Sequence, residues 1–257
     1  MEDLRGDEGL VVIPGGMGGG KSETSIRIRH RLVHTDGLSA LVVQPDGSTR
    51  TGIDSEGEAG SRSGLRTETV RIPSDNPYIA VHIARERSVD IVVFLDSHMF
   101  SPYPLIGSVF ANRKDGRTVL VDTLTFDYGG EEYLAARVLS ARADIIFPPR
   151  YNRCLCQRKK GKPKGKFSQL LIKTPYSKRE ELLALLTGSE NIEMRILVEN
   201  GTRDPKTGLI LPAYAGPRNI TGDVSKSIVI PEGVSTGVDY LARCSRCYVR
   251  PRRLDVF

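Results

Sequence analysis

The clearest candidate for chemistry is a glycine-rich segment near the start of the chain, GGMGGGKS at residues 15–22. It fits the phosphate-loop pattern Gly-x-x-x-x-Gly-Lys-Ser, which ends here in Lys21 and Ser22. Glycines let successive backbone N–H groups converge on phosphate oxygens, and a following helix adds the positive end of its dipole. The expected phosphate-binding glycines are Gly15, Gly16, Gly18, Gly19 and Gly20. A flexible glycine-rich turn is the alternative interpretation.

A magnesium site would complete such a loop. Lys21 would neutralise the β- and γ-phosphates, and the Ser22 hydroxyl would be a ligand of Mg²⁺. The second half of the site is an acid at the end of a buried strand, and the segment IVVFLD supplies Asp96. Apolar strands also end in Asp for solubility alone, so Asp96 is informative only together with the loop. The combination predicts binding of a nucleoside triphosphate and leaves the reaction open.

The elements that position these residues alternate between apolar runs and helical stretches. Strands are expected at 9–13, 38–45, 89–96 and 117–126, and helices at 22–34, 78–86 and 131–143. This alternation predicts an α/β fold of the phosphate-loop NTPase type, with a mostly parallel sheet covered by helices on both faces. Residues 46–64, rich in Gly, Ser, Asp and Glu, are expected to form a long mobile loop.

The character of the chain changes after about residue 149. Basic turns, a short strand at 167–173 and a brief helix at 178–186 are separated there by connections rich in Gly and Pro. The chain of 257 residues is long enough for one core with a smaller appendage. We therefore expect two domains, at 1–150 and 151–257.

Composition restricts the partners. The net charge of +6 is moderate, and much of it lies in the basic runs 158–166 and 250–253. Such runs are more often solvated loops, although they can attract nucleic acid or a triphosphate. No apolar stretch approaches the length of a membrane span, and the acidic N-terminal residues do not read as a secretory signal. A cytoplasmic protein without a membrane partner is the expectation.

The four cysteines form two close pairs, Cys154 with Cys156 and Cys244 with Cys247. In an intracellular chain, clustered pairs of this kind favour a metal site over disulfides.

Several residues together resemble the type II thymidine kinases, a family with a phosphate-loop core and a small zinc-bearing lasso domain. Met17 stands where the family's loop carries a Met, and Asp96 and Phe100, in DSHMF, take two positions of its Asp-Glu-x-Gln-Phe motif. Arg50, in STR, is retained from an Asp-x-Arg motif.

Later motifs extend the resemblance to roughly residues 9–172 and 234–248, in the family's order. The segment TLTFDYGGEEY is similar to a Leu-Asp-x-x-Phe motif followed by Pro-Phe, with Leu124, Tyr128 and Tyr133 at its apolar and aromatic positions. Tyr240 stands four residues before Cys-x-x-Cys, as in the family. No single motif after the phosphate loop is specific, whereas the ordered set is.

The resemblance implies an ATP-dependent kinase for DNA synthesis, which moves the γ-phosphate to the 5′-hydroxyl of thymidine or a related pyrimidine deoxynucleoside. Lys21, Asp96 and Arg50 would be catalytic, and Ser22 and Asp96 would hold Mg²⁺. The residues implied to contact the nucleoside or to close over it are Met17, Phe100, Leu124, Tyr128, Tyr133, Gly237 and Tyr240. A homo-oligomer, specifically a tetramer, is implied as well. Ordinary core packing is the alternative interpretation of the aromatic residues.

The sequence departs from the family at its catalytic carboxylate. The family's Glu after the strand-ending Asp is Ser97 here, and Thr125 replaces the Asp of the later motif. Serine is not a base at neutral pH, so losing the carboxylate should cost on the order of 10²- to 10⁴-fold in rate. Other candidates for this role are His98, Asp127, Glu131 and Glu132. If the strand continues past Asp96, His98 is expected to point away from the site.

The expected lasso domain also departs from the pattern of the family. Cys244-x-x-Cys247 has the spacing that lets two thiolates reach one tetrahedral zinc, whereas Cys154-x-Cys156 needs a different turn. One structural Zn²⁺ held by Cys154, Cys156, Cys244 and Cys247 is expected, with two free or redox-linked pairs as the alternative. Residues of about 174–231 exceed what a simple lasso needs and look like an inserted module or a surface excursion.

Three hypotheses follow. The chain is an active deoxynucleoside kinase in which the base or the substrate has changed, or it is a catalytically weak nucleotide-binding homologue with a structural or regulatory role. A nucleic-acid-associated ATPase is less favoured, because no aromatic residues are interleaved in the basic run 158–166.

Overall fold

The computed structural model describes residues 9–16, 18–48, 57–61, 63–126, 131–148, 167–172, 175–187, 198–199, 201–203, 205, 208, 210–211 and 238–243. The chain divides into two compact units, one of residues 1–125 with 132–150 and one of residues 126–131 with 151–257.

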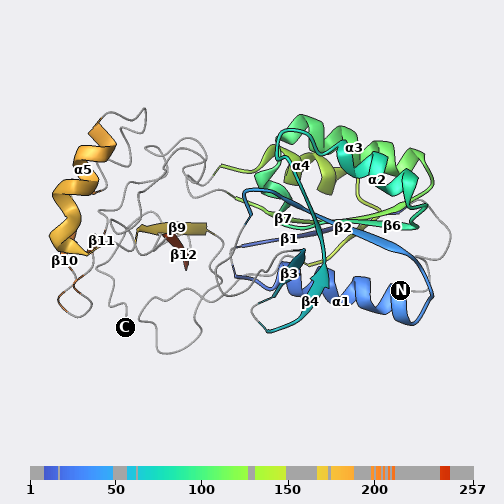
Figure 1. Ribbon diagram of the computed structural model, residues 1–257, viewed down its shortest axis with the longest axis horizontal. Coiled ribbons are helices and arrows are strands. Elements are labelled where there is room, and N and C mark those ends of the chain that lie inside the picture. Colours follow the sequence, from blue (N-terminus) through green and yellow to red (C-terminus); the bar gives the residue numbers. More distant parts are fainter. Residues whose placement is uncertain are drawn as a thin grey trace. The chain divides into compact units, whose positions relative to one another are not determined.

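A six-stranded sheet forms the centre of the first unit (Figure 1). Its strands are β1 (Leu10–Gly15), β2 (Ala40–Pro45), β5 (Val70–Ile72), β6 (Ile91–Phe94), β7 (Thr118–Leu124) and β8 (Ile145–Ile146). They lie in the order β5-β2-β6-β7-β1-β8, and every neighbouring pair is parallel. The predicted α/β fold with a parallel sheet is therefore confirmed.

Helices cover both faces of this sheet. α1 (Lys21–His34) lies on one face, and α2 (Ile79–Glu86), α3 (Pro102–Lys114) and α4 (Leu134–Ala141) lie on the other (Figure 1). Side chains alternate along a strand, so Val119 and Val121 of β7 pack in the core cluster of α2, α3 and α4, while Leu120 packs in the cluster of α1. Both faces are buried, which explains why the strands are continuous apolar runs.

Two segments differ from expectation. No helix was expected at 102–114, because the apolar residues of α3 do not gather on one side of it; Pro102 at its start and Arg113 and Lys114 in its last turn are the signals it offers. The prediction of a mobile loop over 46–64 is wrong at its end, where β3 (Glu58–Gly60) pairs antiparallel with β4 (Arg66–Glu68). Ala59 anchors this hairpin, since it is buried in the cluster of α1.

The second unit holds two short antiparallel pairs. β9 (Phe167–Ile172) pairs with β12 (Val238–Arg243), and β10 (Thr202–Arg203) pairs with β11 (Ile210–Leu211). A 3₁₀ turn at Tyr176–Lys178 leads into α5 (Arg179–Thr187), so the expected strand and helix are both found. The strands on either side of segment 174–231 are thus hydrogen-bonded neighbours. No helix within the described residues is long and apolar enough to cross a membrane.

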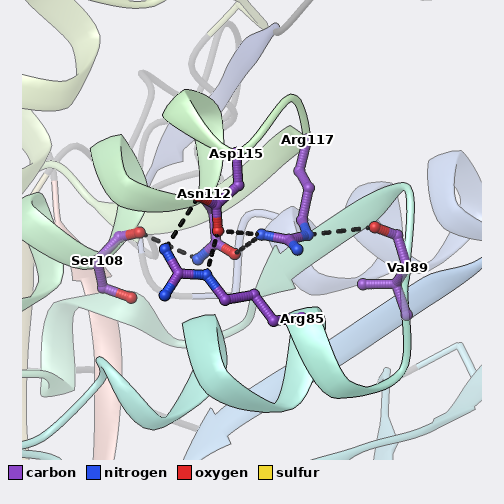
Figure 2. Close-up of polar contacts among 6 residues, drawn as sticks. All are labelled: Arg85, Val89, Ser108, Asn112, Asp115 and Arg117. Carbon is purple, nitrogen blue, oxygen red and sulfur yellow. Dashed lines mark hydrogen bonds and ion pairs between the residues drawn. The ribbon is translucent and has the colours of Figure 1, made fainter.

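A polar network connects the helices to the amino end of the sheet (Figure 2). Asp115, just after α3, accepts hydrogen bonds from Arg85 of α2 (Nε to Oδ2, 2.7 Å) and from Arg117 (Nη1 to Oδ2, 2.7 Å). Arg117 also donates from Nε to the carbonyl oxygen of Val89 at 3.3 Å. The hydrogen bonds from Arg85 and then Arg117 hold the pKa of Asp115 well below its usual range.

Asp115→Asn is expected to lower the free energy of unfolding near pH 7 by about 1–2 kcal/mol, a modest value because the Arg85 side chain is more than half exposed. The pKa of Asp115 is depressed on folding, so its stabilisation is present above the ordinary Asp pKa and is lost as the pH falls below it. Urea unfolding should therefore show a difference from the native chain that begins to shrink below about pH 4 and keeps shrinking toward about pH 2. The exposed Asp75→Asn should show no such difference. A gap for Asp115→Asn that stays constant with pH would contradict the assignment.

Candidate functional site

The glycine-rich segment lies between β1 and the first residue of α1. Gly20 has a φ of 80°, a left-handed backbone that favours glycine. The N–H of Gly19 donates to the carbonyl oxygen of Gly16 at 3.2 Å, and the N–H of Thr24 donates to that of Gly20 at 3.0 Å. The helix therefore begins at the loop and directs the positive end of its dipole into it. The expected strand, loop and helix are all found.

Lys21 is folded back over this loop. Its side chain is only 6% exposed, and Nζ donates to the carbonyl oxygen of Gly16 at 3.0 Å. Ser22, the next residue, is buried as well. A positive charge is therefore already held at the loop, next to the N–H groups at the amino end of α1.

The loop lies at a switch point of the sheet. From β1 the chain passes through α1 to β2 on one side, and from β7 it passes through α4 to β8 on the other side of β1. Gly15 of β1 is in register with Leu124 of β7, and the N–H of Thr125 donates to the carbonyl oxygen of Gly15 at 3.0 Å. Ligands of open parallel sheets bind at such points, outside the carboxyl ends of the strands.

Asp96 follows β6 at the same end of the sheet. Its Oδ2 accepts hydrogen bonds from Ser48 Oγ at 2.7 Å and from Gln44 Nε2 at 3.1 Å, and Gln44 Nε2 also reaches Ser48 Oγ at 2.9 Å. Asp96 itself has a left-handed backbone, with a φ of 48°. A non-glycine residue in this conformation is uncommon and is often found at functional sites. Two side chains from the end of β2 and the turn after it therefore fix the orientation of the carboxylate.

Asp122 of β7 is the acid that the sequence analysis missed. It shares the α1 face of the strand with Leu120, is 0% exposed, and accepts at Oδ1 the N–H of Asp96 at 2.6 Å. Burial, and then the negative charge of Asp96, raise the pKa of Asp122 to about 7, while Lys21 and the Ser22 hydroxyl act in the opposite direction. The available signal was a carboxylate in the middle of the apolar run TVLVDTL.

Unsatisfied polar atoms gather around this acid pair. Four buried atoms have no hydrogen-bond partner among the described residues and lie at or just after the carboxyl ends of β2, β6 and β7: Gln44 Oε1, Ser97 Oγ, Asp122 Oδ2 and Thr125 Oγ1. Such atoms are rare in folded proteins, and an unseen ion, water or ligand is a common explanation. Their clustering identifies this end of the sheet as a polar site.

The residues expected to contact a nucleoside lie in different environments. Phe100 is 3% exposed, and its ring packs edge to face on Phe94 within the core, with 6.0 Å between centroids. Leu124 is buried, whereas Tyr133 is half-buried and its ring lies 5.5 Å from that of His98. The contacts of Phe100 are those of ordinary core packing, the alternative interpretation of the aromatic residues. A contact between Phe100 and a nucleoside base stays a prediction.

The turn after β6 corrects one expectation. The strand ends at Phe94 and a 3₁₀ turn follows at Ser97–Met99, so the premise that His98 points away along a continuing strand is wrong. Ser97 is fully buried in this turn, and Glu131 and Glu132 are exposed.

Several predicted site residues lie outside the described residues: Met17, Arg50, Asp127, Tyr128, Cys154, Cys156, Gly237, Cys244 and Cys247. Tyr240 belongs to β12 of the second unit. Within the described ranges, no group of three or more His, Cys, Asp or Glu side chains could hold a metal ion. The four-thiolate zinc site stays a prediction.

Similarity to known proteins is found among solved structures. No protein-family model and no curated protein matches the sequence. Among solved structures, the Legionella pneumophila ATPase DotB is similar at 17% identity, over 55% of this chain and 36% of DotB, with a TM-score of 0.35. The chain therefore matches little more than a third of DotB. The features that define the site are the loop, the strand order and the buried side chains. By those features the first unit resembles a phosphate-loop NTPase.

Proposed function

We propose that this chain binds a nucleoside triphosphate with Mg²⁺ at the loop between β1 and α1 and transfers its terminal phosphate to an acceptor. The observation that carries the proposal is the buried Lys21 at the amino end of α1, close to the Asp96–Asp122 pair. The finer proposal is an ATP-dependent kinase of thymidine or a related pyrimidine deoxynucleoside. The ordered motifs that resemble type II thymidine kinases support it.

The residues present fit a triphosphate and a divalent cation. The glycine loop offers main-chain N–H groups, and Lys21 can exchange its hydrogen bond to Gly16 for one to a phosphate oxygen. Ser22 and Asp96 supply the oxygen atoms that Mg²⁺ prefers. When bound, Mg²⁺ neutralises negative charge on the phosphate oxygens. Gln44 and Ser48 hold the Asp96 carboxylate in one orientation, so less freedom is lost when a ligand binds.

The site lacks, at the position of Ser97, the carboxylate that would take the proton of the phosphate acceptor. Ser97 occupies the place of the family's carboxylate, its hydroxyl is buried, and it has no hydrogen-bond partner among the described residues. A buried serine does not take the proton of a 5′-hydroxyl at neutral pH. This observation favours a second candidate, a nucleotide-binding homologue with weak catalysis and a structural or regulatory role.

A single-turnover phosphorylation assay separates the two candidates. ATP with Mg²⁺ is offered with a panel of pyrimidine nucleosides to the native chain, to Ser97→Glu and to Ser97→Ala as the matched control, and ATP binding is measured in parallel. Ser97 is fully buried, so a glutamate there must rearrange the 3₁₀ turn, and thermal unfolding checks that this variant folds.

Transfer by the native chain is the result that supports the kinase. A native chain that binds ATP without transferring phosphate supports the weak homologue, if Ser97→Glu restores the transfer and Ser97→Ala does not. The rate of transfer should then rise on the order of 10²- to 10⁴-fold in Ser97→Glu. A native chain that binds no ATP would overturn both candidates. The proposed zinc site and tetramer belong to the finer proposal and are independent of this assay.

A further inference from the structure

Asp122 is an acid for which neither the loop pattern nor the family resemblance provides a role. It interrupts the apolar strand β7 at a fully buried position, between the strand of the phosphate loop and the strand of Asp96. A buried carboxylate is costly unless it is paired or binds a cation. The structure must therefore offer a reason for an acid at this position.

One of the two carboxylate oxygens of Asp122 has a clear role, which is to orient the turn at Asp96. Oδ1 accepts the N–H of Asp96 at 2.6 Å and so helps to fix that left-handed residue. Asparagine would supply the same acceptor without burying a charge. The second oxygen, Oδ2, is buried and has no hydrogen-bond partner in the described part of the chain. Purely structural support of Asp96 leaves this second oxygen unexplained.

A divalent cation accounts for the unpartnered Oδ2 and for an acid in place of asparagine at this position. Asp122 accepts the N–H of Asp96 at 2.6 Å and is in register with Ile13 of β1, the strand whose loop leads into Lys21 and Ser22. Two carboxylates and a hydroxyl form an oxygen-rich donor set of the kind that hard divalent cations prefer. Mg²⁺ is usually held by one or two carboxylates together with substrate phosphates. Asp122, as a second and fully buried carboxylate, supplies the cation with negative charge that the phosphates of a nucleotide would otherwise supply.

We propose that Asp122 is a further ligand of the divalent cation, together with Asp96 and Ser22, and that this cation binds before the nucleotide does. The proposal rests on the proposed nucleotide site and adds an order of binding to it. The cation enters a buried acid pair, and the nucleotide then meets a loop whose acidic neighbours are already neutralised. Lys21 is thereby more available to phosphate, because the cation then compensates the acid pair in its place.

Mn²⁺ binding to the nucleotide-free full-length chain tests this. The probe is Mn²⁺ alone, followed by its electron paramagnetic resonance signal, because this ion prefers oxygen ligands to thiolates. The native chain should take up Mn²⁺ at this site without nucleotide, and added Mg²⁺ should displace it. Asp122→Asn, which keeps the acceptor for the Asp96 N–H, should bind Mn²⁺ at least about tenfold more weakly.

Two further variants keep the result interpretable. Asp75→Asn removes an exposed acid of the same unit and should leave Mn²⁺ affinity unchanged. Ser22→Ala should weaken Mn²⁺ binding too, and it tests the same site if Asp122→Asn does not fold. Thermal unfolding identifies a variant that has failed to fold.

The outcomes separate this inference from the proposed function. If the chain binds ATP with Mg²⁺ but takes up no Mn²⁺ alone, or if Asp122→Asn binds Mn²⁺ as tightly as the native chain, the inference is wrong and the nucleotide site stands. If Mn²⁺ binds and depends on Asp122 while no nucleotide binds, the cation site stands and the proposed function is wrong.

Discussion

Lys21→Ala is expected to weaken the binding of ATP with Mg²⁺ by about a hundredfold or more and to remove phosphate transfer in proportion. The ammonium is buried at the loop before any ligand arrives, so its contribution is not reduced by the cost of ordering a long side chain. Arg27, the next basic residue along α1, is 64% exposed and pairs with Glu23, so it does not replace Lys21 at the loop. Isothermal titration with ATP and Mg²⁺ measures the loss directly.

Arg27→Ala is the matched control for this variant. It removes a positive charge from the same helix, but from an exposed ion pair that contributes little to stability. Nucleotide affinity should stay within about twofold of the native value, since exposed charges of this kind are well screened by salt. Equal losses in Lys21→Ala and Arg27→Ala would mean that general positive charge, rather than the loop, attracts the nucleotide.

Phe94→Ala is expected to destabilise the first unit by about 3–5 kcal/mol, the range for removing a fully buried phenylalanine. Phe94 is 0% exposed, and its ring packs edge to face on Phe100. An aromatic pair of this geometry adds about 0.5–1.5 kcal/mol beyond the area that it buries. The loss should appear as a lower midpoint of urea unfolding, followed by a probe in the first unit.

Tyr103→Ala removes an aromatic ring of similar size from the surface. Its side chain is 75% exposed, so the change in the free energy of unfolding should stay within about 0.5 kcal/mol. A cost for Phe94→Ala as small as that for Tyr103→Ala would contradict the packing of this core. If Phe100→Leu lowered stability in the same way and left nucleoside binding intact, Phe100 would belong to the core alone.

Features that a short segment carries by itself could be predicted from the sequence. The loop at residues 15–22 combines glycines, Lys21 and a flanking strand and helix within one stretch, and Asp96 ends an apolar run that is visible in the printed sequence. The parallel sheet followed from the alternation of strands and helices. Each of these depends on neighbours along the chain.

The rest of the candidate site depends on the order of the strands. Gln44, Ser48 and Asp122 belong to β2, to the turn after it and to β7, and they meet at Asp96 only because β6 lies between β2 and β7. No local pattern specifies this order. Helix α3 was missed for a different reason, because its apolar residues surround the helix instead of forming one stripe.

The pairing of β1 also determines when the loop can be assembled during synthesis. β1 is translated before both of its neighbours in the sheet, β7 and β8, whose residues Val119 and Ile145 pair with Leu10 and Val11. Contacts between segments so distant in sequence form slowly, since the intervening chain must first be brought together. β2 and β6 can pair before either neighbour of β1 has been made. The nascent chain should therefore acquire the half of the sheet that carries Asp96 first, and gain affinity for phosphate only after β7 has been translated.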